Sequence, residues 1–460
     1  MHIFIAPHPP IILPEIGRGE EQKAAATIAG MKRIAGEIAA LKPKTIAVVT
    51  PHGHAFRDAL CVSVERDLTG DFGQFGFPRL KFSFTGSEKA VDFCDALEEA
   101  GIQAVALDRA AARQYQISTH VDHGALVPLS FILNDYSDFE LLHIGMGFLT
   151  KEATCAAGRI LAELLDESDV LLFSGDLSHR LLPESGSGYD KQGAVYDALI
   201  VNAVKNKHYG DILEVSEDLL EHAGQCAQRP FEMMVGALDG YETETEVYSY
   251  EGPYGVGYMT AHIIQGASGA PGVVAAYLSA KKAHAAQKRQ DEDEYVSLAR
   301  NTIEAYIPSG HIIPPPKGLS EALYTEQRGV FVSIKEHGAL RGCIGTIEPV
   351  QSCIAEEIIR NAISAATRDP RFSPIDPSEL DELEISVDVL FPPEDIDGMD
   401  ELDPREYGVI VTKGFRRGLL LPNLEGIDSA EEQVSIALQK AGIRPDERYT
   451  MQRFKVVRHQ

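Results

Sequence analysis

Four short apolar segments of this chain each run directly into a turn that carries a histidine or a carboxylate. The segments read as buried strands, and the turns after them carry His8, His52, His179 and Glu251. In an open α/β sheet, residues that follow the strands meet in the crevice beyond the carboxyl ends, however far apart they are in the chain. We therefore expect these turns to form one metal pocket.

The length of the chain and its changing pattern predict two domains. At 460 residues the chain exceeds what one hydrophobic core usually serves. Over residues 1–265, short apolar runs alternate with helical-period stretches, which predicts an α/β domain with a mostly parallel central sheet flanked by helices. Residues 266–294 are small, polar and charged, so they read as a linker, with a connecting helix over 273–287 as the alternative. Residues 295–460 are expected to form an α+β domain with a mixed sheet.

Charge and hydropathy restrict the classes of partner. The formal net charge is -27, from 69 acidic and 42 basic residues, which disfavours nucleic acid as a main ligand. The first residues lack the pattern of a signal peptide, and no apolar run is long enough for a membrane span. The six cysteines are scattered, without CxxC spacing, and are expected to be reduced thiols. A cytoplasmic protein is expected, without a membrane partner, and a homo-oligomer is left open.

The metal ligands are expected at the ends of three different strands. His8 and His52 both follow a strand and a proline, so the two turns are similar. Two histidines with one carboxylate suit Fe(II) and leave positions open for substrate and oxygen. Glu251 is the candidate carboxylate, because the glycine-rich turn after it would let the backbone approach a metal. His54 is a candidate for a supporting position beside His52, and a loop-capping role is the alternative for His8.

Two further segments carry candidates for proton transfer and substrate binding. His179 follows a strand exit, and a histidine with an ordinary pKa near 6.5 can accept a proton from a bound hydroxyl. The alternative is a histidine at a helix start, capped by Asp176. His120 and His123 lie in one turn, and we expect one of them to face the pocket. His54, His120 and Asp176 are expected near the substrate or behind the ligands.

Residues 1–265 resemble the class III extradiol ring-cleavage dioxygenases, whose fold the Memo proteins share. The matching stretches occur in this order: Pro7-His8-Pro9-Pro10, Pro51-His52-Gly53-His54, Asp122-His123-Gly124, Gly175-Asp176-Leu177-Ser178-His179 and Glu251-Gly252-Pro253. The resemblance implies Fe(II) held by His8, His52 and Glu251, with His179 as the acid/base and His123 helping to bind substrate or oxygen. It also implies a catechol-like aromatic diol and dioxygen as substrates. Zinc or another divalent metal is the alternative in the isolated protein.

The Memo proteins keep this pocket but need not cleave rings, and they carry a cysteine near the position that Glu251 is expected to occupy in this chain. The carboxylate in this chain favours an iron enzyme. A packing role is expected for Cys226, as for most lone thiols, and a position near the same mouth is the alternative.

Residues 295–460 resemble the AMMECR family. The motifs are Leu340-Arg341-Gly342-Cys343-Ile344-Gly345, Asp369-Pro370-Arg371-Phe372 and Arg417-Gly418-Leu419-Leu420-Leu421-Pro422. Arg341 could clamp an anion. Because the sequence shows no obvious base beside Cys343, a buried structural role is expected for it, and a nucleophile activated by a neighbouring cation is the alternative. Gly342 and Gly345 would allow close packing against a neighbour or a ligand. A strand is expected before this motif, with a turn at residues 336–338 between them.

Two hypotheses of function follow. The first is a non-haem iron dioxygenase that acts on a catechol-like diol, with the AMMECR domain shaping or delivering substrate. The second is a Memo-like module that binds a metal or a small ligand without ring cleavage. A fusion of these two families resembles the AmmeMemoRadiSam grouping, which implies a radical S-adenosylmethionine protein as a partner.

Overall fold

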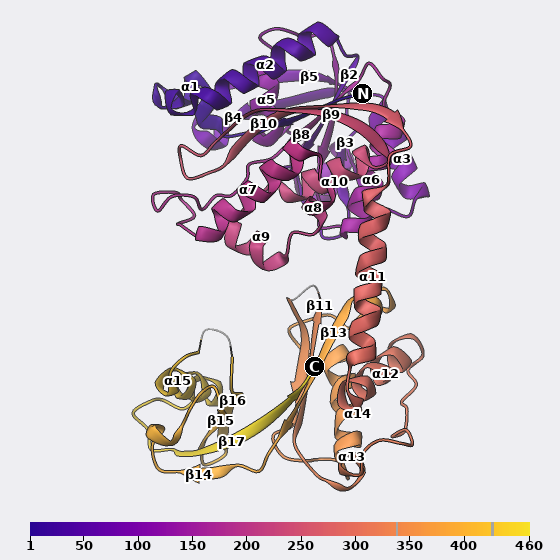
Figure 1. The fold of residues 1–460 in the computed structure, drawn as a ribbon. Helices are drawn as coiled ribbons and strands as arrows, with labels where there is room; N and C mark the ends of the chain where they lie inside the picture. Colours follow the sequence, from indigo (N-terminus) through magenta and orange to yellow (C-terminus); the bar gives the residue numbers. More distant parts are fainter. Residues whose placement is uncertain (337–338, 425–426) are drawn as a thin grey trace. The chain divides into compact units, whose positions relative to one another are not determined.

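The computed structural model describes residues 1–336, 339–424 and 427–460, and the chain divides into two compact units, Met1–Lys281 and Lys282–Gln460. The boundary falls within helix α11 (Val273–Asp291), which occupies much of the expected linker (Figure 1). Two residues of the turn expected at 336–338, His337 and Gly338, lie outside the described residues.

The first unit contains a ten-stranded sheet whose central strands are parallel. The main path runs β4-β5-β7-β2-β8-β1-β10-β9, and β3 and β6 extend it beside β7. Strands β5, β7, β2, β8 and β1 are parallel to one another along this path. The sheet continues in antiparallel pairs at both ends, through β4 beside β5 and through β10 and β9 beside β1. The strands are β1 (His2–Ala6), β2 (Thr45–Thr50), β3 (Leu60–Ser63), β4 (Asp67–Phe72), β5 (Phe77–Gly86), β6 (Ala104–Leu107), β7 (Glu140–Gly145), β8 (Val170–Ser174), β9 (Tyr241–Glu251) and β10 (Tyr258–Ser268).

Helices cover both faces of the central strands (Figure 1), which explains why those strands are apolar at nearly every position. Alternate residues of β1 point to opposite sides: Ile3 and Ile5 enter one core, and Phe4 enters the other. The first core is closed by α3 (Lys89–Glu99), α6 (Lys151–Leu164), α7 (Lys191–Asn206) and α10 (Gln228–Leu238), and the second by α2 (Ala25–Leu41) and α5 (His123–Ile132). The predicted α/β class of this unit is confirmed.

The second unit is an α+β domain built on a curled sheet of seven strands. Its path is β12-β11-β13-β17-β15-β16, with β14 paired to β17, and every described strand pair is antiparallel, where we expected a mixed sheet. The strands are β11 (Val330–Glu336), β12 (Ala339–Gly345), β13 (Leu383–Leu390), β14 (Glu394–Ile396), β15 (Tyr407–Lys413), β16 (Arg416–Leu420) and β17 (Thr450–His459). Helices α12 (Glu294–Ser309) and α14 (Ile354–Thr367) cover one part of the sheet, and α15 (Ala430–Ala441) covers the other.

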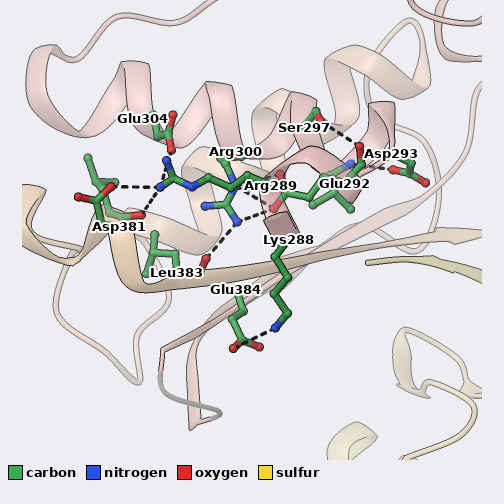
Figure 2. Close-up of polar contacts among 12 residues, drawn as sticks. Lys288, Arg289, Glu292, Asp293, Ser297, Arg300, Glu304, Asp381, Leu383 and Glu384 are labelled. Atoms are coloured by element: carbon green, nitrogen blue, oxygen red, sulfur yellow. Dashed lines mark hydrogen bonds and ion pairs between the residues drawn. The ribbon is translucent and has the colours of Figure 1, made fainter. Parts of the chain in front are cut away.

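A polar network fixes α12 and the end of α11 within this second unit (Figure 2). The Arg300 guanidinium forms a two-pronged ion pair with Glu292, in which both side chains are buried, and it donates a third hydrogen bond to the carbonyl oxygen of Leu383 at the start of β13. Arg289 pairs with Glu304 and Asp381. A buried guanidinium needs such partners to offset its loss of hydration.

Across the described ranges, with residues 337–338 and 425–426 left aside, no helix combines the length and apolar character needed to cross a bilayer.

Candidate metal centre

Three histidines from distant parts of the chain meet at the carboxyl edge of the first sheet. His8 follows β1, His52 follows β2 and His123 is the first residue of α5. Each offers one ring nitrogen, and these three atoms lie within 4.8 Å of one another. The ring centroid of His52 is 4.7 Å from that of His8 and 4.4 Å from that of His123. Three imidazoles at this spacing form a candidate site for a divalent metal.

The hydrogen bonds around His8 determine which of its two ring nitrogens carries the proton. Ser174, at the end of β8, donates its single hydroxyl proton to the carbonyl oxygen of Gly124 at 2.5 Å. The Ser174 oxygen must therefore accept from Nδ1 of His8, 2.8 Å away, which places the imidazole proton on Nδ1. Nε2 of His8 is left unprotonated, which is the form that binds a metal.

His52 and His123 are held near each other by the chain around them. Asp122 caps the N-terminus of α5 by accepting from the backbone N–H of Gly124, which places His123 in the first turn. Gly124 has to be glycine, because a Cβ atom would lie 2.3 Å from the hydroxyl oxygen of Thr50, the last residue of β2. The start of α5 therefore packs directly against the strand end that leads to His52.

Burial favours the neutral form of two of the candidate ligands, His8 and His123. Loss of hydration lowers the pKa of His8 well below its usual value, and the neighbouring His52 lowers it further. The same cause, together with the closeness of His8 and His52, lowers the pKa of His123 to about 3. Neutral imidazoles do not have to lose a proton before they bind a metal, so the site suits a cation near neutral pH.

The carboxylate ligand expected at Glu251 is not part of this group. Its Oε1 accepts hydrogen bonds from the backbone N–H of Thr27 at 2.6 Å and from the Thr27 hydroxyl at 2.7 Å. Glu251 does end its strand at the correct edge, but β10 lies between β9 and β1. Two strand spacings are about 10 Å, whereas a metal ligand lies about 2 Å from the ion. The third member of the group is His123, which we had expected to contact substrate or oxygen.

Asp176 and Cys226 border the cluster on the side of His8. Asp176 accepts from the backbone N–H of His8 at 2.8 Å, and its other oxygen lies 3.8 Å from Nε2 of His8. Burial raises the pKa of Asp176 to about 6. The Cys226 sulfur lies 3.5 Å from the same nitrogen, and burial raises the pKa of this thiol well above its usual value. Cys226 therefore contacts a candidate ligand directly, which agrees with the alternative position at the mouth and not with the packing role that we favoured.

His179 adds a buried nitrogen without a partner. Its Nε2 is buried and makes no hydrogen bond within the described chain, although its backbone N–H donates to the Ala223 carbonyl oxygen. Burial lowers the pKa of His179, Asp176 opposes that change, and His52 adds to it. Buried polar atoms normally have a hydrogen-bond partner, so a ligand bound beside Asp176 and His52 would supply the partner that Nε2 of His179 lacks.

The other two histidines expected near the pocket, His54 and His120, are not part of the three-histidine group. His54 hydrogen-bonds through Nε2 to the carbonyl oxygen of Ser118 at 2.7 Å, and His120 is exposed. Neither Ser174 nor the contact between Cys226 and His8 was anticipated from the sequence. The one sequence signal for Ser174 was its position at the end of an apolar strand.

The AMMECR-like motif forms strand β12, and its arginine is already occupied. The Arg341 guanidinium pairs with the Glu379 carboxylate at 2.6 Å and 3.0 Å, and it also donates to the carbonyl oxygens of Ser373 and Pro374. The anion that Arg341 clamps is therefore Glu379 of the same domain. Gly342 packs against α14, since a Cβ atom would lie 2.2 Å from the Ala365 carbonyl oxygen.

Cys343 lies among polar and charged groups, not in an apolar core. Ser333 donates a hydrogen bond to its sulfur at 3.2 Å, and its backbone N–H donates to Asp369 at 2.9 Å. Asp369 in turn pairs with Arg371 through two nitrogens, so Arg371 is the neighbouring cation that the motif alone did not reveal. These residues make Cys343 a partly exposed thiol beside an ion pair.

Two protein families match this chain, and the boundary between the matched segments lies close to the boundary between the two units of the structure. Residues 2–261 match the family described as the catalytic LigB subunit of aromatic ring-opening dioxygenase, and residues 296–460 match AMMECR1. A protein of Clostridium acetobutylicum is 39% identical over 461 residues, which cover 99% of this chain and 98% of that protein. A protein of Thermotoga maritima is 49% identical over 170 residues, covering 36% of this chain and 98% of its own length. A solved structure of an uncharacterised Pyrococcus horikoshii protein is 38% identical, covers 36% of this chain and 88% of its own, and has a TM-score of 0.34.

Proposed function

Because this chain belongs to the LigB family and carries an AMMECR1 domain after the LigB domain, we propose that its first domain is a metal-dependent oxidoreductase. The substrate class is a small aromatic diol, which reacts with dioxygen. The observation that carries the proposal is the group of three histidines, His8, His52 and His123, at the carboxyl edge of the sheet. In open α/β sheets this edge is where ligands bind.

The residues present fit a divalent metal. His8 presents an unprotonated Nε2, because its other nitrogen donates to Ser174. His52 and His123 would complete the ligand set, and imidazole ligands suit iron, zinc, copper and nickel. When bound, an iron ion would supply Lewis acidity toward the diol oxygens and a redox couple for reaction with dioxygen.

The protein side chains would handle the proton. His179 keeps a buried, unpaired Nε2 near the cluster, and its lowered pKa leaves that nitrogen free to accept a proton from a diol hydroxyl. Asp176 lies close enough to raise the pKa of His179. Its negative charge would therefore stabilise the imidazolium that forms when His179 accepts the proton. His179 is thus the proposed acid/base, acting at Nε2.

A second candidate function rests on Cys226. Its sulfur contacts Nε2 of His8 at 3.5 Å, so it lies beside the three-histidine group. Thiolate ligands favour zinc or an iron site of different reactivity. The alternative is therefore a Memo-like module that binds a metal without ring cleavage and works with a radical S-adenosylmethionine partner.

Metal analysis and oxygen uptake test the two candidates together. The protein is purified without oxygen, its metal content is measured, and oxygen uptake is followed with a panel of catechols. We expect uptake in the wild type and none in His179→Ala, with the iron content unchanged. His208→Ala is the matched control, because His208 is an exposed histidine outside the cluster. Full iron loading without uptake on any diol would favour the second candidate.

A further inference from the structure

A buried histidine that the proposed chemistry does not use lies behind the metal centre. His143 is in the middle of β7 and is only 3% exposed. Its Nε2 lies 2.8 Å from one oxygen of Asp122, and its Nδ1 lies 2.9 Å from the hydroxyl oxygen of Ser63. A carboxylate can only accept a hydrogen bond, so Nε2 of His143 carries the proton, and the Ser63 hydroxyl then donates to Nδ1. His143 could not be singled out in the sequence, because it occupies one position of an otherwise apolar strand.

The carboxylate that His143 holds touches both turns that carry candidate ligands. The other oxygen of Asp122 accepts from the Thr50 hydroxyl at 2.7 Å and from the Gly124 backbone N–H at 2.8 Å. The Thr50 oxygen also accepts from the backbone N–H of His52 at 3.2 Å. One carboxylate therefore joins the turn after β2, which carries His52, to the start of α5, which carries His123.

A carboxylate with both oxygens occupied cannot rotate freely. If His143 were absent, one oxygen of Asp122 would be buried without a donor, and the carboxylate would turn toward another partner. The links to Thr50 and Gly124 would then loosen together, since they share the other oxygen. Groups behind metal ligands that fix ligand orientation commonly change metal affinity by about 10- to 100-fold when they are removed.

We infer that His143 and Asp122 are positioning residues that set the relative placement of His52 and His123 for metal binding. This inference rests on the proposed metal centre. It adds the two residues that hold His52 and His123 in position relative to each other. His143 does not contact the metal in this arrangement and acts only through Asp122.

A second histidine–carboxylate pair of the same sheet provides a matched control. His262 on β10 contacts Glu37 at 2.9 Å and is mostly buried. None of its described hydrogen bonds or ion pairs reaches the three-histidine group. His262→Leu thus removes a buried histidine–carboxylate contact without touching the positioning residues.

The test compares His143→Leu, His143→Gln and His262→Leu in the full-length protein. Affinity for Co(II) and Zn(II) is measured by competition with a coloured chelator, and the Co(II) absorption spectrum reports ligand geometry. We expect His143→Leu to bind about 10- to 100-fold more weakly with a changed spectrum. Glutamine can still donate to Asp122, so His143→Gln should recover most of the affinity, and His262→Leu should match the wild type.

A measurement on the metal-free protein separates this inference from the proposed function. With ¹⁵N-labelled histidine, the imidazole signals of His52 and His123 should shift in His143→Leu and stay in place in His262→Leu, because the two rings stack in the folded protein. If the wild type binds no divalent metal, the proposed function fails, and these signals alone decide the positioning role. Unchanged signals, or wild-type affinity in a folded His143→Leu protein, would overturn it.

Discussion

Removal of the Ser174 hydroxyl is the most direct test of how His8 is prepared for a metal. Ser174 is fully buried and His8 is 2% exposed, so water cannot easily replace the lost contact. In Ser174→Ala, Nδ1 of His8 loses its acceptor and the carbonyl oxygen of Gly124 loses its donor. The imidazole proton is then free to move to Nε2, the nitrogen that faces the other ligands.

The size of the effect follows from these two lost hydrogen bonds. A buried polar group left unpaired costs about 1–3 kcal/mol, so the metal-free protein should lose roughly that much free energy of unfolding. Loss of the group that orients a histidine ligand typically lowers metal affinity by about 10- to 100-fold, which corresponds to about 1.4–2.8 kcal/mol of binding free energy.

Chelator competition with Zn(II) measures the affinity, and urea unfolding of the metal-free protein measures the stability. Ser249→Ala is the control, because the Ser249 hydroxyl contacts Thr260 at 2.7 Å on strands β9 and β10 and has no described contact with His8. We expect the control to keep the wild-type affinity. If Ser174→Ala also keeps that affinity, the assignment of the proton to Nδ1 of His8 is refuted.

Three further predictions concern carboxylates and a buried ion pair. Glu251→Gln should keep the metal content of the wild type, measured by elemental analysis, and loss of the metal would restore Glu251 as a ligand. Burial raises the pKa of Asp197 to about 6. Above that pH the folded protein has to bury the ionised carboxylate, which lowers its stability. Asp197→Asn should therefore be more stable than wild type by up to about 3 kcal/mol at pH 8, with the gain fading as pH falls through 6 toward 4; an equal gain at pH 4 would contradict this cause. Arg300→Met should lower the free energy of unfolding of the second unit by about 3–5 kcal/mol in chemical denaturation, because Glu292 would keep a buried, unpaired charge. A loss below about 1 kcal/mol would show that water solvates the pair.

The strands of the first unit could be predicted because their signal is local. Strands β1, β2 and β8 are apolar at nearly every position, which is typical of parallel strands covered on both faces. The turns after them follow directly in the chain, so the closeness of His8, His52 and Asp176 could be anticipated. The AMMECR motif was equally clear in the sequence. The structure adds that Gly342 of this motif packs against α14 and that Arg341 pairs with Glu379 of the same domain.

The ligand set could not be completed in this way. Glu251 is the last residue of β9, which ends at the correct edge, but the sequence does not reveal that β10 lies between β9 and β1. Cys226 and His143 lie in segments whose patterns predict only a helix start and a buried strand. Each acquires its neighbour, His8 for Cys226 and Asp122 for His143, from chain segments far away in sequence.

The sequence alone therefore determined the two domains, their classes and the two strand-end histidines, because periodicity and turn residues act over a few neighbouring positions. Only the tertiary structure decided that His123 completes the group, that Glu251 does not, and that Ser174 fixes the proton on His8. Those outcomes depend on strand order and on the direction of single hydrogen bonds. Both are set by packing among distant segments, which local propensity does not encode.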